Sequence, residues 1–342
     1  MLLSIWQRVL HRPAIEIDEN FFALGGNLRA ADLLFEEIAR QSGIVLPSAT
    51  IYQAQTIAAL SLFLDQPAIP PFHQRVKIKT GTDPAIFIVH GLAGTLPFFS
   101  LAQHLKSGNA VYGLQGVGVD GLQEPLDRVE DMAALYLDSI RDLQPHGPYL
   151  LIGYSFGGLV ALEMAQRLTT NGEKVALLAL VDAYPHPRYL SLHQSLWLFA
   201  RRAIDPTLMA QRWTRRTASL GRALKSRPKD LSDWRNSDWR NHHADSAAAS
   251  SLSFEQTTRR VKNRAYIALA RYKPRFYDGK IKFVKSESDS YFPADPRSVW
   301  VNLAADFEFQ TVRGGHLDMV TTDCEGLASV LTRYVSDAMP NR

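Results

Sequence analysis

Two patterns of apolar spacing divide the chain. Up to residue 65, apolar residues recur at intervals of three and four positions, which predicts short amphipathic helices. The clearest is expected over residues 28–42, where one face carries Leu28, Ala31, Leu34, Phe35 and Ile38. Shorter helices are expected at 5–10 and 56–64, with Thr56 as the N-cap of the second. The pattern therefore predicts a small all-α bundle over residues 1–65.

From residue 76 to 342 the pattern is different, because short apolar runs alternate with helical spacing. The runs that we interpret as strands are residues 76–79, 85–89, 110–114, 149–152, 175–181, 280–284 and 306–312. Strands that alternate with helices predict a parallel sheet with helices on both faces, an α/β fold. The alternation stops over residues 188–270, where the spacing is helical. Residues 66–75 hold three prolines without periodicity, which predicts a linker between the two units.

Composition narrows the class of protein only a little. The 342 residues leave room for about two domains. The single cysteine, Cys324, excludes an intrachain disulfide, and we expect no metal site. We expect a cytoplasmic protein without membrane contact, since no apolar run approaches the roughly 18 residues of a membrane helix and the N-terminus lacks a signal-peptide pattern. Residues 1–65 hold four arginines against seven acidic residues, so the net charge of +4 comes from the second unit. That bias is too weak to indicate a nucleic-acid partner.

The strongest chemical signal is Gly153-Tyr-Ser-Phe-Gly157, which fits the pattern G-x-S-x-G. A predicted strand precedes it and a predicted helix follows it. In that context Ser155 lies at a sharp turn, with its hydroxyl at a helix N-terminus that favours negative charge. The alternative is a strand-to-helix turn that merely contains a serine. The strand and helix on either side favour a nucleophile.

A serine nucleophile needs a base and an acid that orients the base. Asp182 directly follows the apolar run 175–181, and His316 follows the strand predicted for 306–312. This is the chain order Ser, Asp, His of α/β-hydrolase sheets, with each residue at the end of a strand. The alternatives are a polar residue that ends a strand and a histidine in an ordinary loop.

The loop from His90 to Gly94 is a candidate for the oxyanion hole. Such a hole combines the N–H after the nucleophile with one from the first strand-to-helix loop. The corresponding groups are the backbone N–H of Phe156 and of Leu92, and nearby glycines allow close approach to a carbonyl oxygen. A tight turn that needs glycine for steric reasons alone is compatible with this role.

These residues resemble the type I thioesterase domains of nonribosomal peptide and polyketide synthases. The resemblance rests on FIVHGLAG, GYSFGG, LVDAYP, ARYKPRFYDGKIKFVKS and VRGGHLDMV. It implies an α/β-hydrolase fold, with residues 188–270 as lid helices over an acyl channel. The family usually has proline after the first-loop histidine, whereas this chain has Gly91.

Residues 1–65 resemble a carrier-protein domain of the same synthases. The resemblance rests on DENFFALGG, LRAADLLFEEIARQSGIVLP and TIYQAQTIAALSLFL. Such domains carry phosphopantetheine on a serine directly after L-G-G-x. Here the sequence reads Leu24-Gly-Gly-Asn-Leu28, and no Ser or Thr lies between Phe21 and Arg40. The resemblance therefore predicts a degenerate carrier that holds no arm and keeps a docking or structural role.

The function expected from both units is hydrolysis of an acyl thioester that arrives on a separate carrier protein or on coenzyme A, in concert with synthase enzymes. An acyltransferase or cyclase, or a non-catalytic docking protein, is the alternative. The lid segment holds a run of basic residues that includes Arg212, Arg215 and Arg216. They suggest a contact for an acidic carrier or for pantetheine phosphates, although a solvated helical face explains the same run.

Overall fold

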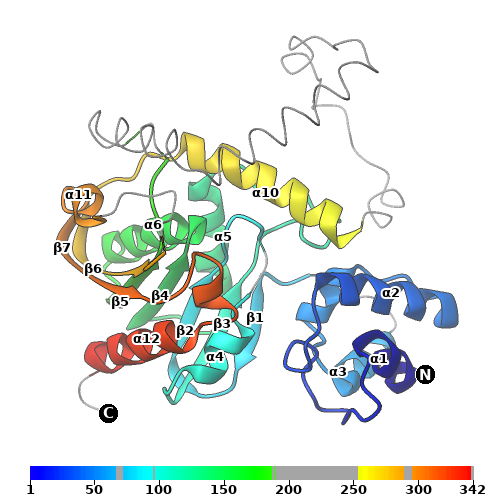
Figure 1. Ribbon diagram of the computed structural model, residues 1–342. Coiled ribbons are helices and arrows are strands. Elements are labelled where there is room, and N and C mark those ends of the chain that lie inside the picture. Colours follow the sequence, from blue (N-terminus) through cyan, green and yellow to red (C-terminus); the bar gives the residue numbers. More distant parts are fainter. Residues whose placement is uncertain (67–71, 95–96, 187–188, 190–252, 289–294, 340–342) are drawn as a thin grey trace, which may run out of the picture.

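The computed structural model describes residues 1–66, 72–94, 97–186, 189, 253–288 and 295–339. Its N-terminal elements are α1 (Leu2–Leu10), α2 (Leu28–Ser42), the 3₁₀ turn η1 (Ser48–Tyr52) and α3 (Ile57–Leu64). The helix expected at 5–10 begins earlier, because Leu2 is also part of the buried face. These elements share one apolar core, so the predicted helical unit is present (Figure 1).

Side-chain caps fix where two of these helices begin. The side chain of Asn27 accepts a hydrogen bond from the N–H of Ala30 at 3.0 Å, at the start of α2. Thr56 accepts from the N–H of Ala59 at 3.1 Å, as its predicted role at the start of α3 requires. Each cap satisfies an N–H that has no carbonyl partner within its own helix.

The second unit is built on a seven-stranded sheet in the order β1-β3-β2-β4-β5-β6-β7. The strands are β1 (Arg75–Lys79), β2 (Thr82–Val89), β3 (Asn109–Leu114), β4 (Tyr149–Tyr154), β5 (Val175–Val181), β6 (Tyr277–Ser286) and β7 (Ala304–Val312). All neighbouring strands are parallel except β1, which pairs antiparallel with β3 at the edge. β2 begins at Thr82, three residues before the strand expected at 85–89.

Helices cover both faces of this sheet (Figure 1). α5 (Val129–Arg141) and α6 (Phe156–Thr170) share a core with Phe87 and Val89 of β2. α4 (Phe99–His104) and α12 (Glu325–Ala338) lie on the opposite face, in the core that contains Ile86 and Ile88. Successive side chains of β2 thus enter opposite cores, which confirms the predicted α/β class.

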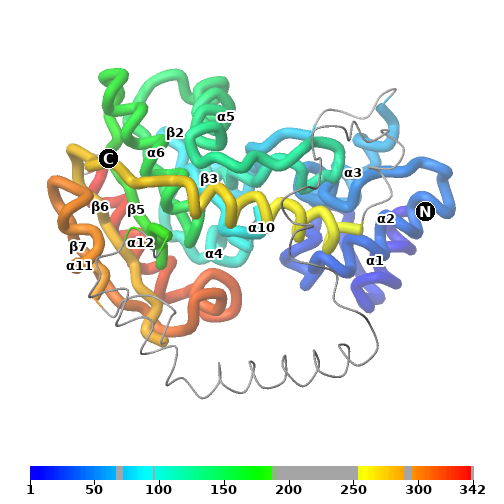
Figure 2. The backbone as a smooth tube through the Cα atoms, turned by 90° about the horizontal axis from the view of Figure 1, so that it is seen from above, coloured from blue at the N-terminus to red at the C-terminus, as the bar shows by residue number. Residues whose placement is uncertain are grey.

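Three shorter or peripheral elements complete the described part: α10 (Phe254–Arg271), α11 (Arg297–Trp300) and the 3₁₀ turn η5 (Asp318–Val320). α10 runs from the sheet unit to α2, as seen from two directions (Figures 1 and 2). It covers the end of the segment 188–270 that we expected to form a lid, and most of the rest of that segment lies outside the described residues. So do residues 67–71 of the expected linker. Among the helices that the structure describes, none has the length and apolarity to cross a bilayer.

Candidate active site

Ser155 stands at a strained turn between β4 and α6. It is the N-cap of α6, and its backbone has φ 54° and ψ −124°, a conformation that L-residues rarely adopt. A Cβ atom on Gly153 would lie 2.4 Å from the Cα of Gly158, and one on Gly157 would lie 2.1 Å from the carbonyl oxygen of His90. The glycines on either side of the serine are therefore required for steric reasons, as the sequence pattern indicates.

Asp182 follows β5 and is fully buried. Its own N–H donates to the carbonyl of Val284 on β6 at 2.7 Å. Its carboxylate accepts from the Ser286 hydroxyl at 2.8 Å and lies 2.8 Å from His316 Nδ1. Ser286 is the last residue of β6 and of the stretch ARYKPRFYDGKIKFVKS, but we did not select it as a site residue from the sequence.

His316 connects the other two residues. Its Nε2 atom lies 3.0 Å from the Ser155 hydroxyl, while Nδ1 faces the Asp182 carboxylate. Since a carboxylate only accepts, Nδ1 carries the proton and donates, which leaves Nε2 able to accept the serine proton. The structure thus brings the three residues selected from the sequence into one hydrogen-bonded chain. The imidazole keeps 34% of its surface exposed, so a substrate can reach it.

Tyr154, the variable residue before Ser155, supports this histidine. Its ring stacks on the imidazole of His316 with centroids 5.0 Å apart, and its hydroxyl donates to the His316 carbonyl at 2.8 Å. Burial, and after it the negative charge of Asp182, raises the pKa of Tyr154, so the phenol stays protonated and remains a donor. The sequence pattern leaves this position open and does not indicate the contact.

The loop after β2 lies beside the serine. A Cβ atom on Gly91 would be 3.8 Å from the Cβ of Ser155 and 3.1 Å from the ring of Tyr154. Leu92 follows directly in this loop, and Phe156 is the first residue of α6, where an N–H has no acceptor within the helix. The two backbone segments selected for the oxyanion hole therefore flank Ser155.

The buried side chain of His90 holds this loop through hydrogen-bond contacts. The side chain is 1% exposed, Nδ1 contacts the carbonyl of Gly91, and Nε2 lies 2.6 Å from the hydroxyl of Tyr136. Burial lowers the pKa of His90 to about 4, against the effect of the Gly91 hydrogen bond. The neutral ring donates from Nδ1, and its Nε2 contacts the hydroxyl of Tyr136, which also donates to the Gln115 carbonyl at 3.1 Å. Tyr136 lies on α5, and the sequence does not reveal it as a partner.

Because burial lowers the pKa of His90, we expect the free energy of unfolding to fall at acidic pH. Its pKa is about 4 in the folded chain and about 6.5 when unfolded, so the unfolded state binds more protons between these values. Stability is therefore full above about pH 6.5 and falls by about 3 kcal/mol as the pH is lowered to about 4. We expect thermal unfolding of His90→Gln to lose less of its Tm over this range than the wild type. The control His104→Gln, at an exposed histidine of α4, should follow the wild-type curve, and parallel curves for all three proteins would contradict the assignment.

The chain matches the models of two known families. Residues 84–201 match the model of the thioesterase domain. Ser155 and Asp182 lie within this range. The chain carries a thioesterase domain. Residues 2–64 match the model of the phosphopantetheine attachment site, so the N-terminal unit is of the carrier type.

Among curated relatives, the chain is 35% identical over 192 residues to a dimodular nonribosomal peptide synthase of Bacillus subtilis, and 36% identical over 187 residues to malpibaldin synthetase of Mortierella alpina. The matches cover 54% and 53% of this chain but only 8% and 3% of those proteins. The chain therefore spans a small fraction of the length of these relatives.

Solved structures show that the fold of both units is shared. A holo four-domain nonribosomal peptide synthetase bound to AMP and glycine superposes with a TM-score of 0.56 at 21% identity, over 99% of this chain and 26% of that one. The NocB thioesterase domain, in covalent complex with a fluorophosphonate nocardicin G analogue, gives a TM-score of 0.51 at 23% identity, over 75% of this chain and 96% of that one. The predicted α/β-hydrolase fold behind a helical carrier-like unit is thus confirmed. The candidate contacts Arg212, Arg215 and Arg216 lie outside the described residues.

Proposed function

We propose that this protein is an acyl-thioester hydrolase that releases an acyl, peptidyl or polyketidyl group from a carrier protein or coenzyme A. The observation that carries the proposal is the position of His316, 3.0 Å from the Ser155 hydroxyl and 2.8 Å from the Asp182 carboxylate. The match of residues 84–201 to the thioesterase domain supports the same class of substrate.

The proposed reaction has two steps with a covalent intermediate. The Ser155 oxygen attacks the thioester carbonyl, and its proton passes to His316 Nε2. The carbon–sulfur bond then breaks, and the thiol leaves with that proton while the acyl group stays on Ser155. Water attacks the acyl-enzyme with His316 as the base, and the carboxylic acid is released. Asp182 holds the imidazole and stabilises its positive charge in both steps.

The carbonyl oxygen carries negative charge in each tetrahedral intermediate. We assign its stabilisation to the backbone N–H groups of Leu92 and Phe156, on the two segments that flank Ser155. Donors of this kind act most strongly when they are already in place before the charge develops. The His90 and Gly91 contacts described above hold one of the two segments.

Product analysis tests the function and its main alternative. The purified protein is mixed with a panel of acyl-pantetheine thioesters, and thiol release and acyl products are measured together. Free acid supports hydrolysis, whereas a macrocycle, or an ester or amide of an added acceptor, would identify a cyclase or acyltransferase. No acyl release from any thioester would contradict both.

We also propose that the N-terminal unit carries no phosphopantetheine, although it is of the carrier type. The arm needs a hydroxyl at the N-terminus of α2, and the residue directly after Leu24-Gly-Gly-Asn is Leu28. Asn27 is engaged as the cap of α2, and its amide cannot form a phosphodiester. Substrates then arrive on a separate carrier protein of a synthase or on coenzyme A.

Incubation with a phosphopantetheinyl transferase and coenzyme A tests this point. Intact-mass measurement should show no gain on the wild-type chain, because no serine is available at the helix start. The variant Leu28→Ser restores a hydroxyl directly after L-G-G-x and serves as the positive control. An arm on residues 1–65 of the wild type would overturn the proposal.

A further inference from the structure

The N-terminal unit is packed against the thioesterase domain by aromatic side chains. The ring of Phe22 stacks on that of Phe99 in α4, with centroids 4.2 Å apart and planes within 13°. Tyr52, at the end of η1, meets the edge of Phe254 in α10 at 5.9 Å. Tyr52 and Phe254 are 2% and 1% exposed, so this contact is part of one continuous core rather than a surface encounter.

A carboxylate of the N-terminal unit also caps α10. Asp32, on α2, accepts a hydrogen bond from the backbone N–H of Phe254 at 3.1 Å. The Ser48 hydroxyl donates to the same oxygen at 2.6 Å and orients the carboxylate. Within α10, Ser253 and Gln256 form a capping box, which leaves the Phe254 N–H for the external acceptor. A negative charge at this end also complements the dipole of α10.

The same helix reaches the candidate oxyanion loop. Val261 lies two turns after Phe254 and is 4% exposed. A Cβ atom on Gly94 would lie 2.5 Å from Val261 Cγ1, and one on Gly116 would lie 3.0 Å from it. Gly94 has φ +73°, a conformation that suits glycine, so the loop passes directly beneath the helix. The position of Val261 therefore limits where the loop of Leu92 can lie.

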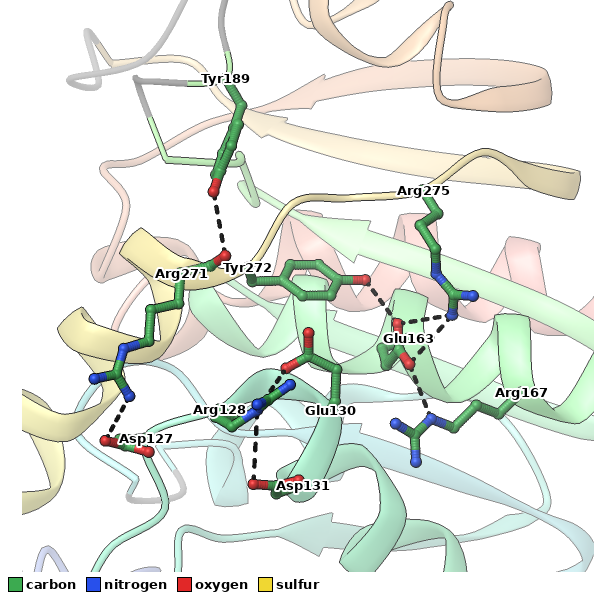
Figure 3. Close-up of polar contacts among 10 residues, drawn as sticks. All are labelled: Asp127, Arg128, Glu130, Asp131, Glu163, Arg167, Tyr189, Arg271, Tyr272 and Arg275. Carbon is green, nitrogen blue, oxygen red and sulfur yellow. Dashed lines mark hydrogen bonds and ion pairs between the residues drawn. The ribbon is translucent and has the colours of Figure 1, made fainter.

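The far end of α10 is fixed to the helix that carries Ser155. Glu163 on α6 is 2% exposed, and it accepts from Tyr272 at 3.1 Å and from Arg167 at 2.9 Å (Figure 3). Arg275 pairs with the same carboxylate at 3.2 Å. With this end anchored, the capping contact with Asp32 helps to hold the other end, together with the ion pair of Arg260 on α10 and Glu124 at 2.5 Å.

We propose that the N-terminal unit is a fixed positioning element of the acyl-transfer site, with Asp32 as its positioning residue. Asp32 and the aromatic contact hold the N-terminal end of α10, and Val261 then keeps the oxyanion loop beside Ser155. The inference rests on the proposed function of that loop. It gives the carrier-type unit a role that needs neither a phosphopantetheine arm nor a carrier partner.

A small soluble substrate separates this role from carrier docking. With an acyl N-acetylcysteamine thioester, no carrier protein takes part in the reaction. We expect Asp32→Ala to lower kcat about tenfold with little change in KM, since small displacements of catalytic groups have effects of this size or larger. Asp32→Asn keeps an oxygen that accepts from Phe254 and should retain most of the rate.

Two further variants serve as a control and as an independent test of the contact between the two units. Glu36→Ala removes an exposed carboxylate one turn further along α2 and should keep the wild-type kcat. Phe22→Leu weakens the aromatic contact and should lower kcat several-fold even if Asp32→Ala does not fold. Rates are divided by the number of sites that a fluorophosphonate labels at completion, which removes the effect of unfolded protein.

The outcomes distinguish the two proposals. Wild-type kcat in both Asp32→Ala and Phe22→Leu would overturn the positioning role and leave the proposed hydrolase intact. A loss seen only with substrates bound to a carrier protein would identify a docking surface instead. If wild-type Ser155 is not labelled by the fluorophosphonate, the proposed function itself fails.

Discussion

Replacing Ser155 by alanine should lower kcat/KM for acyl-pantetheine thioesters by roughly ten-thousand-fold or more. The change removes the atom that would form the acyl bond, while His316 keeps its hydrogen bond to Asp182. The residual rate would come from water attack assisted by the backbone N–H donors. Alanine fits the turn as well as serine does, so we expect the fold to survive.

The matched control is Ser61→Ala, at an exposed serine of α3 in the N-terminal unit. It should hydrolyse the same thioesters at the wild-type rate. Thiol release is followed with a chromogenic thiol reagent, and circular dichroism checks the fold of both variants. A Ser155→Ala rate within tenfold of the wild type would rule out the serine as nucleophile.

The second large effect is expected for Asp182→Asn, with a loss of roughly 10³- to 10⁴-fold in kcat. An asparagine can turn its NH₂ group toward His316 Nδ1, which then has to accept rather than donate. That tautomer places the ring proton on Nε2, where it cannot take the proton of Ser155. The buried negative charge that stabilises the imidazolium is lost as well.

Ser286→Ala is the control for Asp182. It removes the 2.8 Å hydrogen bond to the carboxylate but leaves both the charge and the contact with His316. We expect a loss of about tenfold, in keeping with one hydrogen bond to a charged group. Equal losses in Asp182→Asn and Ser286→Ala would contradict the role that we give to the negative charge of Asp182. The rate of fluorophosphonate labelling should fall in parallel with kcat.

The parts of the fold that follow from local chemistry could be predicted from the sequence. The run 175–181 forms β5 over the same residues, because a fully apolar stretch fits a strand in the middle of a parallel sheet. α2 extends from Leu28 to Ser42 as expected, with Asn27 as its cap and Gly43 after its end. The glycines around Ser155 indicate the tight turn for the same local reason.

The parts that depend on distant partners could not be predicted in this way. Residues 82–84 join β2 because the N–H of Thr82 donates to the carbonyl of Gly108 and the side chain of Asn109 donates to that of Pro84. Both partners lie on or next to β3, so the residues around Thr82 do not indicate these contacts. Tyr136 supports His90 from another helix, and Ser286 supports Asp182 from another strand. No spacing rule connects such pairs.

The contact between the two units is the clearest example of this limit. Asp32 lies on α2, 222 residues before Phe254, and in the sequence it is only one polar residue on an amphipathic helix. Its partner is a backbone N–H, which every non-proline residue has. The contact therefore follows only from the fold, which brings the N-terminal end of α10 next to α2 (Figure 2).

The central claim is that Ser155 carries the acyl group during turnover. The most direct measurement mixes the protein with an acyl-pantetheine thioester, stops the reaction in acid within one turnover, and determines the intact mass and the modified peptide. We predict a mass gain equal to the acyl group on the peptide that contains Ser155, and none in Ser155→Ala. Turnover of the thioester with the acyl group on another residue, or with the same product formed by Ser155→Ala, would contradict the account.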